Sequence, residues 1–415
     1  MARPERRTVR DVRRGNRSML LRTLYFAGPT SRNDLTRLTG LSAATVSTMT
    51  GDLLGEGIIT EAGQVESDGG RPRVLLRVDP LYGYAIGVDV AETHVRVELF
   101  DLGMNERAKV EYALRPARHD PELVARHIIA GIEVVLSDAG VPSAQVLGVG
   151  VGVPGIVERG EDVVIHAKTF GWEGVPLGAL LRTGSALPLP PLHVGNGTKA
   201  MGQAELWFGS GRDAGDAVIV LIGSGVGAAV VTGGATFHGV SSSAGEWGHT
   251  KIVAGGRPCR CGGRGCLEAY IGAEAILERA GVSTQTAGRH EELTRLLASD
   301  SPVVEETIDY LGVGLGNLVN LINPGHIVVG GWVGLLLGER LLPAIRRAAA
   351  ENSLPQPYAA TSIVLGHLGP DAVALGAATL VLEEFFAAAP AARARERPVT
   401  RRDRPFASDG GRYWD

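Results

Sequence analysis

The three cysteines of this chain lie within eight residues, and their cluster is the strongest constraint on the fold. Cys259, Cys261 and Cys266 occupy a glycine-rich stretch, and His249 stands ten positions before the first of them. Thiolate and imidazole groups are preferred ligands of Zn²⁺, and four of them close a tetrahedral structural site. The C-x-C-x4-C spacing differs from that of common zinc fingers. The alternative is three free thiols in a loop, or one disulfide, although free cysteines are usually scattered and buried.

The segment around the cysteines resembles the zinc loop of the ROK family, which comprises repressors, open reading frames and sugar kinases. In that family Glu-x-Gly-His precedes C-x-C-G-x-x-G-C-x-E. The resemblance extends from about residue 16 to residue 386, and it implies that the histidine and the cysteines hold a structural Zn²⁺ while two glutamates and the histidine face a sugar. The matching residues are Glu246, Gly248, His249, Cys259, Cys261, Gly262, Gly265, Cys266 and Glu268.

The length of 415 residues predicts two or three domains. No apolar run reaches the roughly 18 residues that a membrane-spanning helix needs, so no membrane partner is predicted. Cysteines that act as metal ligands, and not as disulfides, fit a reducing compartment, which predicts a cytoplasmic protein.

Charge is distributed unevenly along the chain. Residues 1–80 contain 13 Arg, no Lys and nine Asp or Glu, a net charge of +4, whereas the whole chain carries −4, so the remainder carries −8. A basic head on an acidic body predicts that only the head meets a polyanion.

The basic head has the sequence pattern of a DNA-binding domain. We expect a disordered basic arm over residues 1–15 and an α+β winged helix-turn-helix domain over residues 16–80. Ser31 and Ser42 are good N-caps for two short helices, and Gly40 forms the turn between them. ROK repressors carry such a domain and ROK kinases lack it, so the resemblance agrees.

The second helix of this motif predicts a surface for operator DNA. Residues 57–60 and 74–78 are expected to be the strands of a wing, and the arginines between them can enter a minor groove. The alternative is a protein-interaction module with a polar loop. The candidate DNA-binding residues are Ser42, Ala44, Thr45, Ser47, Thr48, Arg71 and Arg73.

The remainder of the chain predicts two similar α/β lobes, because a strand, hairpin, helix and strand recur twice. Residues 81–195 form the first lobe, which helix 372–386 completes, and residues 196–371 form the second lobe with the zinc loop. Residues 387–415 are expected to be a disordered tail. The resemblance implies a two-lobed actin-like ATPase (RNase H-like) fold with its ligand in the cleft.

Two departures from the family pattern predict that the chain is not a kinase or any other enzyme. ROK kinases have Asp-x-Gly-Gly-Thr after the first strand, and both glycines are replaced here, by Ala91 and Glu92. The catalytic base of the family is the Asp of an Asn-Asp pair, and the matching pair is Asn196-Gly197. Loss of a general base costs roughly 10²–10⁴-fold in rate. The glycine turn at residues 223–227 is weak evidence for phosphate, and we expect a hairpin there.

The sugar-facing residues of the family are partly retained. The candidate ligand-binding residues are Asn196, Glu246, His249 and Glu268, whereas Thr169 replaces a family asparagine. The ligand is then a different carbohydrate, or binding is weak, or the site is vestigial. Alternatively, the two glutamates support the zinc loop and bind no ligand.

Together these features predict a cytoplasmic transcriptional regulator of carbohydrate metabolism, such as a repressor. It would bind operator DNA, sense a sugar or sugar derivative, and assemble as a homodimer or tetramer. In this hypothesis the zinc loop couples ligand binding to DNA binding. The alternatives are an active ATP-dependent sugar kinase with a DNA-binding head, or a ligand-independent DNA-binding protein with a vestigial cleft.

Overall fold

The computed structural model describes residues 8–67, 70–114, 119–159, 162–185, 188–212, 214–282 and 288–388. They fall into two compact units, one ending at Arg77 and the other spanning Val78–Ala387. The first seven residues of the expected arm and the expected tail from residue 389 onward lie outside the described ranges. Within those ranges every helix is too short or too polar to cross a membrane.

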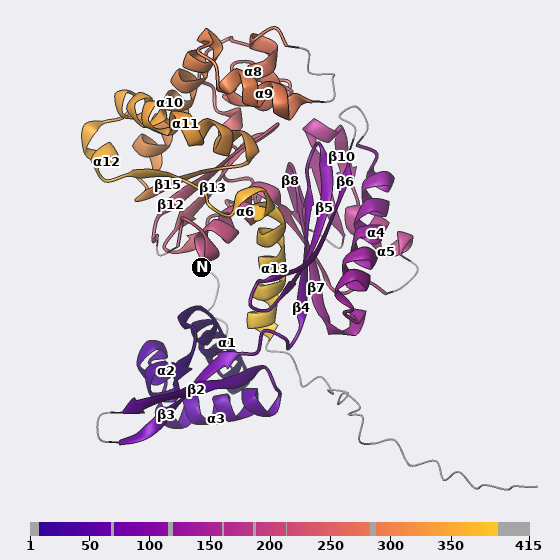
Figure 1. Ribbon diagram of the computed structural model, residues 1–415, viewed down its shortest axis with the longest axis vertical. Coiled ribbons are helices and arrows are strands. Elements are labelled where there is room, and N and C mark those ends of the chain that lie inside the picture. Colours follow the sequence, from indigo (N-terminus) through magenta and orange to yellow (C-terminus); the bar gives the residue numbers. More distant parts are fainter. Residues whose placement is uncertain are drawn as a thin grey trace, which may run out of the picture. The chain divides into compact units, whose positions relative to one another are not determined.

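The N-terminal unit has three helices and a three-stranded sheet with strand order β1-β3-β2. The turn between its second and third helices is Gly40, whose φ is +69°, a conformation that glycine adopts without strain. The elements are α1 (Val9–Ala27), β1 (Thr30–Ser31), α2 (Arg32–Thr39), α3 (Ala43–Gly55), β2 (Ile59–Ser67) and β3 (Gly70–Val78), as labelled in Figure 1.

The first helix corrects the predicted arm. It begins at Val9, and residues 8–15, expected to be disordered, belong to its cap and first turns. The Thr8 side chain accepts a hydrogen bond from Asp11 N, and the Asp11 carboxylate accepts one from Thr8 N, which forms a capping box. The predicted caps of the next two helices are confirmed, since Ser31 accepts from Asp34 N and Ser42 accepts from Thr45 N.

The wing strands are longer than predicted. Expected over residues 57–60 and 74–78, they span β2 and β3, and residues 68–69 between them lie outside the described ranges. The segment from Gly70 to Arg73, expected to be a loop, therefore belongs to β3. Thr30 and Ser31 add the short strand β1, which pairs antiparallel with β3.

The larger unit contains two five-stranded sheets of the same topology. In each sheet three antiparallel strands are followed by two parallel ones, and the strand orders are β11-β7-β4-β5-β6 and β14-β13-β12-β15-β16. Each sheet has its own buried apolar cluster. This repeat of topology confirms the predicted two-lobed architecture.

The first lobe lies on the right of Figure 1 and carries an additional small sheet, β10-β9-β8, that was not predicted. Its elements are β4 (Tyr84–Val90), β5 (His94–Asp101), β6 (Glu106–Ala113), α4 (Pro121–Ala139), η1 (Ser143–Gln145), β7 (Val146–Val153), β8 (Ile156–Arg159), β9 (Val163–Ala167), η2 (Lys168–Phe170), β10 (Trp172–Val175), α5 (Leu177–Gly184) and β11 (Leu192–Asn196).

The second lobe lies at the upper left of Figure 1 and is richer in helices. Its elements are α6 (Gly197–Phe208), β12 (Ala217–Ile222), β13 (Val226–Thr232), β14 (Ala235–Thr236), η3 (Trp247–His249), α7 (Glu268–Ile271), α8 (Ala273–Arg279), α9 (Arg289–Leu297), α10 (Pro302–Ile322), β15 (His326–Gly330), α11 (Trp332–Glu351), α12 (Pro355–Ala359), β16 (Ser362–Leu365) and η4 (Gly369–Asp371).

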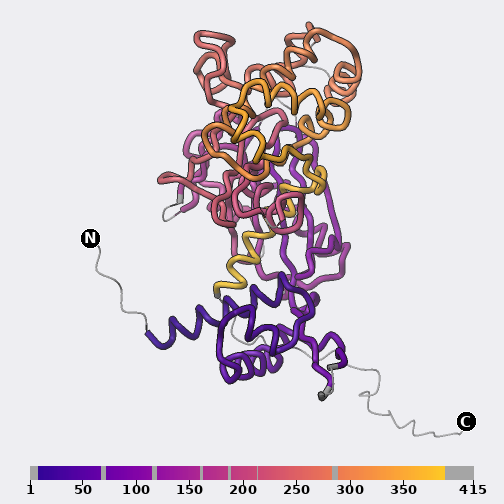
Figure 2. Tube along the Cα trace, turned by 90° about the vertical axis from the view of Figure 1, so that its left-hand side faces the viewer, coloured from indigo at the N-terminus to yellow at the C-terminus, as the bar shows by residue number. Residues whose placement is uncertain are grey.

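The last helix, α13 (Ala372–Ala388), returns to the first lobe (Figures 1 and 2). A Cβ atom at Gly87 on β4 would lie 1.9 Å from the Ala374 carbonyl oxygen, and one at Gly150 on β7 would lie 1.8 Å from the Ala377 oxygen. Only glycine permits so close an approach of helix and sheet. The helix predicted over residues 372–386 therefore packs directly on the first sheet.

Glu98 on β5 is a fully buried carboxylate without a hydrogen-bond partner among the described residues. Arg96 Nε lies 4.0 Å from its Oε1, and the carboxylate of Asp371 lies within 4.8 Å. Burial raises the pKa of Glu98 to about 9, and repulsion from Asp371 adds to the increase. Glu98 therefore carries a proton at neutral pH.

This proton makes the stability of the body depend on pH. The pKa of Glu98 is about 9 in the folded chain against an ordinary 4.5, so the stabilising contribution is complete below pH 4.5 and is lost as pH rises towards 9. Glu98→Gln, which mimics the protonated acid, should change stability little near pH 5 and raise it near pH 8 by on the order of a few kcal/mol. Denaturant unfolding at both pH values measures the difference.

Glu133→Gln is the matched control, because Glu133 is an exposed glutamate on α4, outside the cluster of Glu98, Glu106 and Asp371. Its unfolding free energy should follow that of the unmodified chain across the pH range. Parallel pH profiles for Glu98→Gln and the unmodified chain would show that Glu98 does not carry the proton.

Candidate metal centre and ligand cleft

Four side chains with metal-ligating atoms converge in the second lobe. Nδ1 of His249 and the Sγ atoms of Cys259, Cys261 and Cys266 all lie within 4.8 Å of one another. Cys259 Sγ is 3.7 Å from His249 Nδ1, and the other two sulfurs are 3.7 Å apart, without a disulfide. A tetrahedral Zn²⁺ with bonds of about 2.3 Å to sulfur holds its ligand atoms about 3.8 Å apart. The predicted ligands are therefore brought together with spacings that fit a tetrahedral ion.

The backbone of the cysteine loop brings these ligands together through tight turns. Lys251 and Cys266 form an isolated antiparallel bridge, and the short helix η3 presents the histidine. Gly265 has a φ of +74°, and a Cβ atom there would lie 1.7 Å from the Val253 carbonyl oxygen. Glycine is required at this turn for both reasons.

A lysine and a glutamate lie close to the thiols. Lys251 Nζ lies 2.7 Å from Cys266 Sγ, and Glu268 Oε1 lies 3.8 Å from Cys259 Sγ. Burial raises the pKa of the Cys259 thiol to about 12, so this thiol keeps its proton when no cation is bound. A metal ion that binds here displaces that proton, which makes metal affinity increase with pH.

The two candidate ligand-binding glutamates differ in their surroundings. Glu246 is exposed and does not cap η3 with its side chain; desolvation raises the pKa of its carboxyl, and attraction to His249 and Lys199 partly offsets this. Glu268 is buried, and its Oε2 accepts a hydrogen bond of 3.0 Å from Val226 N. Glu246 can thus accept hydrogen bonds from a ligand, whereas Glu268 already supports the zinc loop and the start of β13. His249 has Nδ1 on the metal side, which leaves Nε2 for a ligand.

The remaining candidate polar positions lie where lobe one meets α6. Asn196 caps α6 by accepting a hydrogen bond from Lys199 N at 3.1 Å, and its amide donates to the Gly155 carbonyl at 2.8 Å. Both ends of this amide are therefore occupied by backbone groups. Gly197 is the first residue of α6, and Thr169 lies half-buried in η2.

An ion pair that sequence reasoning missed joins the zinc loop to the first lobe. Glu92 lies in the turn between β4 and β5, and its Oε2 accepts a hydrogen bond of 2.7 Å from Arg260 Nη1. The sequence marks Glu92 only as a replacement of a family glycine, whereas the structure pairs it with Arg260, which lies between Cys259 and Cys261. The 168 residues that separate the pair hide it from any local pattern.

The candidate DNA-binding residues lie on α3 and β3. Thr45 is half-buried beside its cap, with Oγ1 2.8 Å from Ser42 Oγ, and Arg71 is placed only by its backbone in β3. The others have exposed side chains and are Ser42, Ala44, Ser47, Thr48 and Arg73.

Metal content tests the cluster directly. We expect about one zinc ion per purified chain, and Cys261→Ser should reduce this to near none after dialysis against a chelator, because three ligands no longer close the tetrahedron. Inductively coupled plasma mass spectrometry measures the stoichiometry. Arg264→Ala is the control, since Arg264 is exposed in the same loop and donates only to the Gly255 carbonyl. Full retention of zinc by Cys261→Ser would exclude Cys261 as a ligand.

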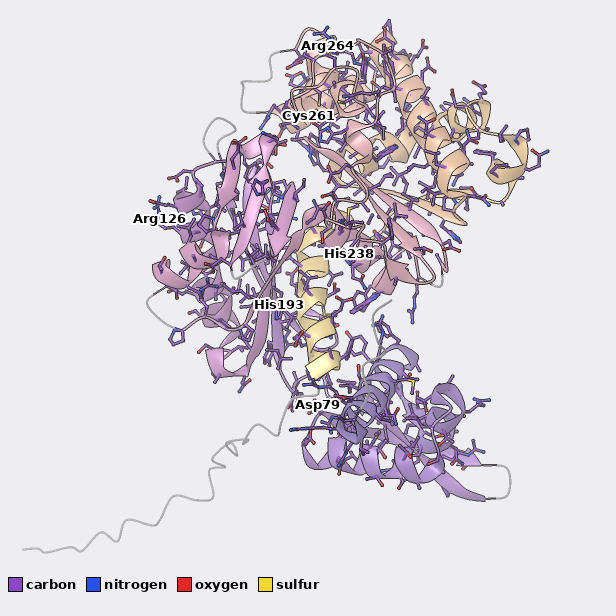
Figure 3. The ribbon with its side chains drawn as sticks, turned by 180° about the vertical axis from the view of Figure 1, so that it is seen from behind. Asp79, Arg126, His193, His238, Cys261 and Arg264 are labelled. Carbon is purple, nitrogen blue, oxygen red and sulfur yellow. The ribbon has the colours of Figure 1, made fainter. Side chains whose placement is uncertain are left out.

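Figure 3 labels Cys261 and Arg264 at the end of the second lobe that lies beside the first lobe. The metal cluster, the carboxylate of Glu246 and the Glu92–Arg260 pair thus occupy one region, where the turns of the two lobes meet. This arrangement can hold a metal ion close to carboxylates that accept hydrogen bonds.

Known proteins match nearly the whole chain. A xylose repressor from Caldicellulosiruptor bescii is 29% identical over 387 residues, which cover 89% of this chain and 96% of the repressor. A glucokinase from Halalkalibacterium halodurans is 30% identical over 321 residues, which cover 72% of this chain and 95% of the kinase. The crystal structure of a ROK family transcriptional regulator, a homologue of the E. coli MLC protein, matches with a TM-score of 0.74 at 24% identity and covers 91% of this chain and 97% of that one.

The solved structure shares the fold of this chain over most of its length, as the repeated sheet topology predicts. The sequence model of the ROK family matches residues 85–384, which include both lobes and the cysteine loop. The chain therefore belongs to the ROK family, and its body has the two-lobed actin-like ATPase fold.

Proposed function

We propose that this chain is a DNA-binding transcriptional regulator whose body senses a carbohydrate, holds a structural zinc and does not phosphorylate sugars. The observation that carries this proposal is the N-terminal unit, in which α2 and α3 present an exposed polar face beside a two-stranded wing. The similarity to a xylose repressor covers 89% of the chain, which is too much to leave out the whole of this unit, whereas the glucokinase covers 72%.

The exposed face of α3 has the chemistry of a surface that enters a DNA groove. Ser47 and Thr48 are short and polar and leave the helix axis free to approach phosphates and base edges. Arg73 adds a positive charge on the wing. The net charge of +4 over residues 1–80 supports electrostatic attraction to DNA.

The charges in the cleft support a neutral sugar as the ligand. Glu246 and Glu268 place two carboxylates beside the metal cluster. Carboxylates accept hydrogen bonds from hydroxyl groups, whereas phosphate or carboxylate groups on a sugar would be repelled. A neutral sugar is therefore favoured over sugar phosphates and uronic acids.

The absence of a kinase base supports a regulatory role. Gly197 has no side chain to accept a proton, although a Cβ atom there would meet its nearest heavy atom, Val373 Cγ1, at 3.4 Å. A Cβ atom therefore fits at this position without a clash. In the first lobe, Glu92 is paired with Arg260 in a turn that lacks both family glycines.

The zinc site supports the same function because it holds two short helices in place. It fixes η3 and the start of α7, which carry His249 and Glu268. In a reducing cytoplasm the cysteines stay available to the metal. A homodimer or tetramer would place two N-terminal units on paired half-sites, and ligand-induced movement of the loop would change their spacing.

DNA binding tests the proposal first. An operator is selected from random duplexes with the zinc-loaded protein and its affinity is measured by fluorescence anisotropy. Ser47→Glu should weaken binding by roughly tenfold or more, because it places a negative charge against the phosphate backbone. The control is Ser137→Glu, the same change at an exposed position on α4 in the body. Equal losses in the two variants would assign the effect to net charge and would contradict a role for α3.

Ligand recognition is tested by thermal shift with a panel of neutral sugars, sugar phosphates and uronic acids. At a hundredfold its Kd, a neutral sugar should add about 2.7 kcal/mol to stability and raise the Tm. Glu246→Ala should abolish the shift, because the acceptor is removed. Glu133→Ala, an exposed glutamate on α4, should keep it.

The same panel with Mg²⁺ and ATP separates a sensor from a kinase. ADP release measured with a coupled assay should stay at background for every sugar that raises the Tm. Turnover with the bound sugar would favour the kinase alternative, and a shift produced only by sugar phosphates or uronic acids would contradict the neutral-ligand proposal.

A further inference from the structure

The side chain of Arg260 spans three separate segments of the body. Nη1 donates to Glu92 Oε2 at 2.7 Å, and Nη2 donates to the Ser224 carbonyl oxygen at 2.7 Å. Nη2 also lies 3.6 Å from Glu268 Oε1. One guanidinium therefore connects the β4–β5 turn of the first lobe, the β12–β13 turn of the second lobe and the carboxylate that supports the zinc loop.

The backbone of Arg260 is fixed at its base. It stands between Cys259 and Cys261, two of the four metal-ligating residues, so its Cα position follows that of the cluster. A planar guanidinium offers its donors in a fixed fork, which allows it to hold two acceptors in a defined relative position. The side chain can thus transmit the position of the loop to both turns.

The Glu92 end of this contact is equally constrained. The Glu92 side chain is only 15% exposed, and its carbonyl oxygen is 2.8 Å from Nε2 of His119. His119 stacks on Phe170 with 4.1 Å between ring centroids. Phe170 closes η2, which contains Thr169, the residue at a sugar-facing position of the family. These contacts connect Glu92 to η2, the segment of the first lobe that contains Thr169.

The cavity beside these residues belongs to the second lobe. It has a volume of about 80 Å³, and its lining includes Ser224, Arg260, Glu268 and Glu274. Glu274 accepts a hydrogen bond from Ser224 Oγ at 3.0 Å and is paired with Arg289 at 2.8 Å. The turn that Arg260 holds is thus braced from its other side by a second ion pair.

We propose that Arg260 is a positioning residue of the ligand cleft. Its contacts with Glu92 and Ser224 hold the two lobes at one fixed angle to each other, and its contact with Glu268 makes that angle depend on the position of the zinc loop. A ligand that contacts Glu268 or His249 must then act on the same guanidinium that joins the lobes. The role of the cleft as a sensor rests on the proposed function, whereas the lobe-to-lobe connection does not depend on it.

Hydrogen–deuterium exchange on the zinc-loaded full chain, without DNA or sugar, tests the connection. Arg260→Ala in the second lobe should accelerate exchange of backbone amides at residues 91–94 in the first lobe by roughly tenfold. Reciprocally, Glu92→Ala should accelerate exchange at residues 223–226 in the second lobe. At residues 91–94 the double variant should exchange no faster than Arg260→Ala alone, because that single variant has already lost the contact with Glu92.

Arg264→Ala is the matched control in the same loop, and it should leave exchange at both turns unchanged. Zinc content of all variants is measured alongside and should stay at the level of the unmodified chain. Acceleration confined to the lobe that carries the substitution, or additive acceleration in the double variant, would overturn the proposal. Because neither DNA nor sugar is present, failure of the proposed function would leave this result standing, and the reverse also holds.

Discussion

The convergence of one imidazole and three thiols on a single point is the constraint on which the ligand cleft depends. The loop between His249 and Glu268 contains no strand and no helix beyond η3, so little regular hydrogen bonding fixes its course. Its shape comes from isolated bridges, from glycine turns and from the convergence of four side chains that can bind a metal ion. Arg260 and Glu268 are carried by this loop or follow it directly, so their positions relative to the first lobe follow from the metal cluster.

Local chemistry explains which parts of the fold could be predicted from the sequence. The caps Ser31 and Ser42 and the turn at Gly40 act within three or four residues, and the helices around them begin and end where predicted. The start of α1 was missed because Thr8 and Asp11 form a capping box inside a run of arginines that is typical of a disordered arm. The small sheet β8-β9-β10 was missed because its strands are only four or five residues long.

In the candidate site, too, the features that were predicted are local in the sequence, and the features that were missed depend on contacts between distant residues. The four metal-ligating residues share one short stretch of chain, so the sequence alone indicated the cluster that the structure assembles. The pairing of Glu92 with Arg260 depends on how two lobes meet, and no spacing rule connects positions so far apart. Glu246 and Glu268 carry the same functional group in the sequence. They are distinguished only by burial and by the backbone amide of Val226, which become visible once β13 and α7 are placed.

The two departures from the kinase pattern have different physical consequences, because one removes a side chain and the other adds a charged one. At Gly197 a group is simply missing, and the surrounding atoms leave room for a Cβ atom. At Glu92 a group has been added, and the fold provides it with a partner, a low exposure and a braced backbone. Burial raises the pKa of the Glu92 carboxyl, and the hydrogen bond and attraction to Arg260 offset part of the cost of burying its charge. In the proposed regulator no nucleotide phosphate has to enter, so this position can hold the lobes together. A ligand that moves the loop would then also move the contact between the lobes.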